Sequence, residues 1–211
     1  CGFHPSLDRL YTTNFTLARV VAYDAGSSHR IVQRIDPAGT SAEGHSRSLA
    51  FDADGNLFVG HVDGHRRVHQ YGDDGGLLKA FEVAVDGRGA EATELAADQT
   101  TLFYATGGRA IRRFDTVTMT QLPDFVSLAG SGYAFDLRLL PPGDGTGGLL
   151  VADGNQVKRL SPAGHVVQAY DDVGRDTWSA LSLDPDGISF WAADSETDHV
   201  YRFHIESGRI E

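Results

Sequence analysis

A short apolar segment recurs five times along the 211-residue chain, at a nearly constant interval. The segments are residues 10–13, 57–60, 102–105, 149–152 and 190–193, and their starts are separated by 47, 45, 47 and 41 residues. Each is followed by a turn and a second recurring string, at residues 19–23, 67–71, 110–114, 156–160 and 199–203. Two features that share a period of about 45 residues indicate an internal repeat.

Each repeat has the patterning of short β-strands joined by tight turns. Apolar and polar residues alternate within the recurring strings, which is typical of half-exposed strands. Turns rich in Asp and Gly separate them, as at residues 52–56 and 184–187, because Gly adopts positive φ at little steric cost. The second repeat shows four predicted strands most clearly, at residues 48–51, 57–62, 66–71 and 77–83.

Four short antiparallel strands in every 40–50 or so residues are typical of one blade of a β-propeller. Because a lone blade cannot bury its faces, we predict an all-β fold: a single propeller domain, residues 1–211, of about five four-stranded blades. The expected blades are residues 1–43, 44–89, 90–130, 131–175 and 176–211. No spare strand is visible to close the ring. A larger propeller of which this chain forms part is therefore the alternative, and open strand edges would favour self-association.

Composition excludes several functional classes. The hydrophobic fraction of 41% and the charged fraction of 22% are those of a globular protein. A net charge of −11 without a basic stripe argues against nucleic acid as a partner, and no apolar stretch is long enough to predict a membrane span. One cysteine excludes an intramolecular disulfide framework. We expect a soluble extracellular or periplasmic protein, although the cysteine content is equally compatible with the cytoplasm.

Two stretches, residues 49–59 and 181–194, carry an Asp-x-Asp-Gly turn between apolar strands and precede a Val-containing strand with an aromatic end. In this they resemble NHL-repeat and gluconolactonase-like (senescence marker protein-like) propellers. The resemblance covers nearly the whole chain and implies blade architecture. Propellers of this kind include protein-binding modules, lactonases and lyases, so the fold alone does not imply an activity.

The resemblance to the lactonase-like members also implies a place for a divalent cation such as calcium, held by oxygen ligands at the axial mouth. The relevant position lies two residues before a recurring Leu and holds Arg47, Thr93, Phe135 and Ser179, none of them a good ligand. Glu94 and Asp136 are carboxylates one place later, so a shifted site stays open. A metal-dependent hydrolase, lactonase or lyase is therefore the alternative function.

A second group of metal-ligating side chains surrounds one predicted hairpin. It contains His61, Asp63, His65 and His69, and imidazoles bind zinc or copper. A turn at residues 63–66 would place His61 opposite Val68, so the spacing does not predict that His61 and His69 converge. An exposed hairpin at the propeller rim is the simpler interpretation.

The leading hypothesis is a non-catalytic propeller that binds a protein partner or a small ligand at its axial face. The sequence contains no Gly-x-Ser-x-Gly nucleophile motif. Pockets combine a few aromatic rings with convergent polar groups, and the expected ligand-binding residues are Arg47, Glu94, Tyr133, Asp136, Trp178 and Ser179. Arg138 joins Arg47 as a cation that would face an anionic ligand.

One place in the repeat holds a large aromatic residue in three of the five copies. Phe58, Phe103 and Trp191 occupy it, in the middle of an apolar segment. Packing between blades requires large side chains at such a place. We therefore predict that all three are core residues.

Overall fold

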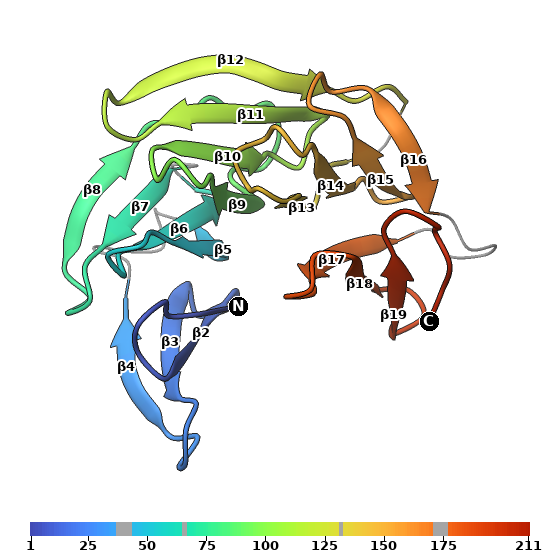
Figure 1. Ribbon diagram of the computed structural model, residues 1–211. Coiled ribbons are helices and arrows are strands. Elements are labelled where there is room, and N and C mark those ends of the chain that lie inside the picture. Colours follow the sequence, from blue (N-terminus) through green and yellow to red (C-terminus); the bar gives the residue numbers. More distant parts are fainter. Residues whose placement is uncertain (37–43, 65–66, 131–132, 171–176) are drawn as a thin grey trace.

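Nineteen strands form five antiparallel sheets in the computed structural model, which describes residues 1–36, 44–64, 67–130, 133–170 and 177–211. The sheets follow one another around an axis as the blades of a five-bladed β-propeller (Figure 1). This confirms the predicted all-β fold. Among the described residues, no helix is long and apolar enough to cross a membrane.

Neighbouring strands in each sheet are consecutive in sequence. The first sheet contains β1 (Gly2–Phe3), β2 (Arg9–Asn14), β3 (Arg19–Asp24) and β4 (Ile31–Ile35). The second contains β5 (His45–Phe51), β6 (Leu57–Val62), β7 (Val68–Tyr71) and β8 (Leu77–Phe81). The third contains β9 (Ala92–Leu95), β10 (Thr101–Ala105), β11 (Ala110–Asp115) and β12 (Thr120–Ser127).

The fourth sheet contains β13 (Asp136–Leu139), β14 (Leu149–Ala152), β15 (Val157–Leu160) and β16 (Val166–Tyr170). The fifth contains three named strands in the described part of the chain, β17 (Trp178–Leu183), β18 (Ser189–Asp194) and β19 (His199–His204). An isolated antiparallel bridge joins Phe203 of β19 to Ile210, so the fifth sheet differs from the predicted four-stranded blade.

The turn glycines have the backbone conformation that the sequence predicts. Gly55, in the turn between β5 and β6, has a φ of 88°, and Gly187, between β17 and β18, has a φ of 69°. A Cβ atom on Gly55 would also lie 2.6 Å from Nε2 of His4. Only glycine meets both demands at this turn, because a side chain would be strained at this φ and would clash with His4.

The hydrophobic core lies between the sheets rather than within one of them. Each neighbouring pair of sheets encloses one cluster of buried side chains, which gives four clusters for five sheets. Phe58 of β6 packs toward the third sheet and Phe103 of β10 toward the fourth, and both are buried as predicted. The central three sheets are therefore covered on both faces.

The ring is open between the first and fifth sheets (Figure 1). The closely packed strand pairs of the described residues join successive sheets, and none joins β1–β4 to β17–β19. Trp191 of β18 occupies the same place in the repeat as Phe58, yet it is 41% exposed. The prediction that Trp191 is a core residue is therefore wrong, because no sheet of the described ranges covers the face of the fifth sheet on which it lies.

Candidate ligand-binding site at the axis

Strands β5, β9, β13 and β17 lie nearest the axis (Figure 1), and a polar side chain of each of the first three bonds to the backbone of the next blade. The connecting residues Ser48, Glu94 and Asp136 occupy one place in the repeat, immediately before the recurring Leu. Ser48 Oγ donates to the carbonyl of Ala90, 3.1 Å away. The amide of Leu139 donates to Glu94 Oε2 over 2.9 Å, and the amide of Leu181 donates to Asp136 Oδ2 over 2.7 Å. We call these three residues the axial latch.

A hollow of about 350 Å³ opens beside the latch, at the axial side of the gap in the ring. Its lining comes from all five sheets and includes Thr13, Arg47, Glu91, Asp136, Ser179 and Trp191. We call this hollow the axial pocket. It combines an aromatic ring with several convergent polar groups, as small-molecule sites do.

Two arginines supply the positive charge of the axial pocket. Arg47 Nε donates to Glu91 Oε2 over 2.8 Å, and the Glu91 side chain is almost fully buried. Arg138 Nη1 donates to Asp136 Oδ1, also over 2.8 Å. The other N–H groups of Arg47 and the Nε and Nη2 groups of Arg138 have no hydrogen-bond partner among the described residues. Each guanidinium is therefore fixed by one carboxylate and keeps donors for a ligand.

Glu94 lies beside Arg138 in an adjoining hollow of about 290 Å³. Burial of its carboxyl raises the pKa of Glu94 from its ordinary value of 4.5 to about 7, and the negative charge of Asp136 adds to this rise. Arg138 and the amide of Leu139 oppose the shift without cancelling it. Glu94 therefore exchanges its proton near neutral pH.

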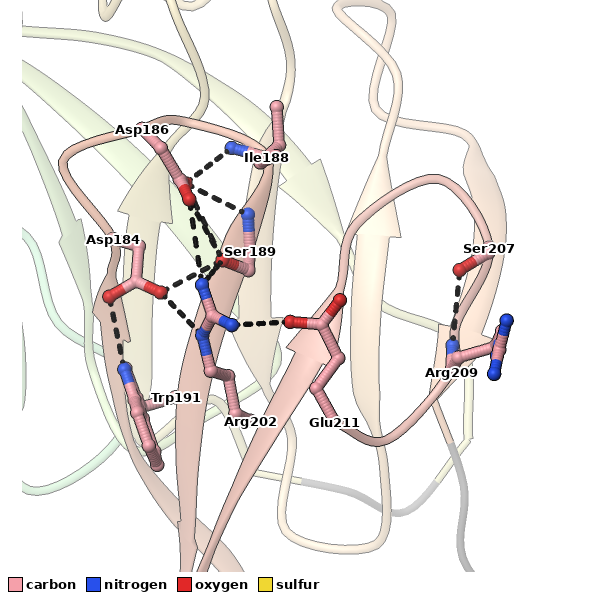
Figure 2. Close-up of polar contacts among 9 residues, drawn as sticks. All are labelled: Asp184, Asp186, Ile188, Ser189, Trp191, Arg202, Ser207, Arg209 and Glu211. Carbon is pink, nitrogen blue, oxygen red and sulfur yellow. Dashed lines mark hydrogen bonds and ion pairs between the residues drawn. The ribbon is translucent and has the colours of Figure 1, made fainter.

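A polar network on the open face of the fifth sheet holds the Trp191 ring (Figure 2). Trp191 Nε1 donates to Asp184 Oδ1 over 3.0 Å, and Arg202 Nε donates to Asp184 Oδ2 over 2.8 Å. Arg202 also donates to Ser189 Oγ and to the carboxylate of Glu211. The hydrogen bond from Arg202 is the main cause of the lowered pKa of Asp184. The indole is thus an oriented, half-exposed wall of the axial pocket.

The structure brings part of the predicted site together. Arg47, Asp136 and Ser179 line the axial pocket, and Glu94 lies in the adjoining hollow. Tyr133 is 57% exposed and lines neither hollow, while Trp178 is fully buried among the residues between the fourth and fifth sheets. Ligand binding by the six residues stays a prediction.

Among the axial-pocket residues that sequence reasoning missed, Glu91 and Trp191 matter most to its chemistry. Glu91 stands between Ala90 and Ala92, and an acid in such an apolar setting is a signal for a buried, paired charge. Trp191 gave no such signal, because its repeat position is buried in the second and third sheets.

The histidines of the predicted hairpin also differ from expectation. The amide of His61 donates to the carbonyl of Arg67, and Gly60 pairs with Val68, so the predicted pairing of His61 with Val68 is wrong by one residue. His61 and His69 consequently lie on one face with ring centres 4.7 Å apart, and both are buried. Asp63, with a φ of 61°, pairs instead with Arg88. His65 and Arg66 lie outside the described residues.

No group of three or more His, Cys, Asp or Glu side chains suited to a metal ion occurs in the part of the chain that the structure describes. The structure confirms the five-bladed propeller architecture. No protein-family model matches the chain, and no curated protein matches it either.

Proposed function

We propose that the protein is a non-catalytic propeller that binds a small ligand carrying a carboxylate group in the axial pocket. The observation that carries this proposal is the pair of guanidiniums, Arg47 and Arg138, that line one hollow of about 350 Å³ with donors to spare. Arginine presents its N–H groups in a planar fork that matches a carboxylate, and such charge-assisted bonds are the stronger ones.

The rest of the pocket suits the carbon skeleton of such a ligand. Trp191, Val200 and Leu49 contribute apolar surface, and Ser179 contributes a hydroxyl. The acids that hold the two arginines balance the charge, which supports a ligand that is itself polar and modest in net charge. An aromatic wall with a few oriented polar groups is the usual composition of a selective pocket.

The axial latch supports binding rather than hydrolysis. Glu94 and Asp136 are the carboxylates closest to the metal-ligand position expected in a calcium-dependent hydrolase. Each accepts a hydrogen bond from a backbone N–H of the next sheet. A divalent cation would compete with these structural bonds for the same oxygens. Metal-dependent hydrolase, lactonase or lyase activity with calcium stays the alternative.

The test is a binding titration with a panel of small carboxylates, gluconate, citrate and glutamate, each paired with a neutral alcohol or amide analogue. At least one acid is expected to bind in calorimetry. Arg47→Gln and Arg138→Gln should each weaken it by about 10- to 100-fold, since a charged hydrogen bond contributes about 1.5–3 kcal/mol. Arg113→Gln, on the outer strands, is the control and should bind normally.

Equal binding of acids and neutral analogues, or full affinity in both pocket variants, would contradict the carboxylate proposal. Calcium is added in a parallel series, with the products analysed by chromatography. Calcium-dependent turnover of a lactone would replace the binding function by the hydrolase alternative.

A second proposal concerns the faces on either side of the opening. Phe3 and Val200, 68% and 60% exposed, lie on the uncovered faces of the first and fifth sheets, and we propose that a second copy of the chain covers them. Sedimentation velocity should show concentration-dependent association, weakened by Phe3→Lys, which lies outside the axial pocket. Val117→Lys, on an exposed turn of the third sheet, is the matched control, and equal association of both variants would overturn the proposal.

A further inference from the structure

A small polar cluster interrupts the apolar layer between the first and second sheets. His61 of β6 is fully buried, and neither of its ring nitrogens has a hydrogen-bond partner among the residues that the structure describes. Ser46 of β5 is paired with His61 in the strand register, and its buried hydroxyl likewise has no partner in the described part of the chain. Buried polar groups in folded proteins are nearly always satisfied, so three orphaned atoms in one place require an explanation.

A second imidazole lies next to this cluster. The His69 ring centre is 4.7 Å from that of His61, with 56° between the ring planes, and His69 is 3% exposed. His69 Nδ1 lies 3.2 Å from the hydroxyl of Tyr71, and this contact fixes the orientation of the His69 ring. A metal-ligating histidine usually has a partner of this kind for its other nitrogen.

The separation of the two ring centres is close to that of two imidazoles sharing one ion. With metal–nitrogen distances of about 2.0–2.1 Å, two rings on a tetrahedral ion place their centres about 5 Å apart. A neutral imidazole has one ring nitrogen with a free lone pair, and both ring nitrogens of His61 are buried without a hydrogen-bond partner among the described residues. Neutral imidazole is the ligand that zinc and copper accept most readily.

We propose that His61 and His69, together with the hydroxyl of Ser46, bind one late transition-metal ion, zinc or monovalent copper, between the first and second sheets. This site is independent of the axial pocket. It also differs in chemistry from a calcium site, because its ligands are mainly nitrogen atoms rather than carboxylate oxygens.

The experiment uses the whole chain after removal of metals with a chelator. The protein is refolded and dialysed against Zn²⁺, or anaerobically against Cu⁺, and bound metal is counted by mass spectrometry. Refolding in the presence of the ion allows for the complete burial of His61. One equivalent per chain and a rise in melting temperature on loading are expected for at least one of the two ions.

His61→Leu distinguishes a metal site from a structural histidine. Leucine removes the orphaned nitrogens, so the metal-free variant should melt at or above the temperature of the metal-free wild type, yet it should bind no metal and show no rise on loading. His165→Gln changes an exposed histidine and should load like the wild type. The proposal is overturned if neither ion binds stoichiometrically, or if His61→Leu retains the bound ion.

Discussion

The two tryptophans of the chain lie in opposite environments, although both belong to the fifth sheet. Trp178 is fully buried and packs edge-on against Tyr201 and Phe203. Trp191 is 41% exposed and lines the axial pocket. Strand β17 begins at Trp178, so this side chain belongs to the layer between the fourth and fifth sheets rather than to the loop before the strand.

This contrast predicts that two matched substitutions lower the free energy of unfolding by very different amounts. Trp178→Ala should lower the free energy of unfolding by about 3–5 kcal/mol, because it leaves a large cavity in the core. At a protein concentration low enough to keep the chain monomeric, Trp191→Ala should cost less than about 1 kcal/mol, because the Trp191 side chain is already 41% exposed in the single chain. Urea unfolding of both variants gives the comparison. Similar losses in the two would mean that the open face of the fifth sheet is in fact covered in solution.

Glu94 makes stability depend on pH. Because its pKa rises from 4.5 to about 7 on folding, the folded protein binds this proton more tightly than the unfolded chain. The stabilising contribution of the Glu94 proton is fully present below about pH 4.5. It is lost, and the free energy of unfolding falls, as the pH rises through 7.

Glu94→Gln should therefore match the wild type at pH 5 and exceed its stability by about 1–3 kcal/mol at pH 8, where the buried charge is absent from the variant. Urea unfolding at both pH values measures the difference. Glu206→Gln is the control, since Arg159 lowers the pKa of this exposed carboxyl, and it should give no gain at pH 8. A Glu94→Gln variant no more stable than wild type at pH 8 would contradict the raised pKa.

Part of the candidate site could be predicted from the repeat alone. Alignment of the copies places Arg47 and Asp136 near the axis, because equivalent residues of different blades converge there. Alignment does not give the length of a hairpin, and a one-residue difference in register brings His61 and His69 together. Alignment also assumes that every blade has two neighbours. This assumption does not hold for the fifth sheet, to which Trp191 belongs.

At the scale of elements, the axial latch explains why an inner strand carries an acid where an apolar residue would be expected. Ser48, Glu94 and Asp136 each bond the backbone of the following sheet. The fourth member of the series is Ala180 in β17, which has no polar side chain and, among the described strands, no following sheet beside it. The position thus carries a polar side chain in the three blades where that side chain bonds to a following blade.

The latch can be tested at Asp136. Asp136→Ala leaves the Leu181 amide and the Arg138 guanidinium without their shared acceptor, and should lower the free energy of unfolding by about 2–4 kcal/mol. Asp136→Asn keeps one acceptor oxygen and should recover part of the loss. Chemical denaturation of the two variants measures this order. An Asp136→Ala variant as stable as Asp136→Asn would show that the latch does not hold the fourth and fifth sheets together.

The strands themselves are the part of the fold that a sequence predicts best. Alternation and glycine turns depend on neighbouring residues, and Leu57–Val62 forms a strand with the predicted bounds. The strand predicted to begin at residue 66 is instead named from Val68, and residue 66 lies outside the described part of the chain. Closure of the ring depends on contacts between distant blades, which local patterning does not contain.

At the scale of the whole molecule, an open ring is a row of sheets in which only the inner members have two neighbours. The second, third and fourth sheets are covered on both faces, whereas the first and fifth each share one core cluster. Stability in such arrays is close to a sum of terms for each unit and each interface. The end sheets should therefore open more readily than the middle ones.

Hydrogen–deuterium exchange under native conditions tests this gradient. Amides of β10 and β14, at the centre of the row, should exchange slowest, and those of β3 and β18 should exchange faster, because they require the loss of only one interface. If two chains cover the open faces, protection of β3 and β18 should rise with protein concentration, while that of β10 stays constant. Uniform protection of all five sheets at low concentration would instead require contacts between the first and fifth sheets that close the ring, and would contradict the open arrangement.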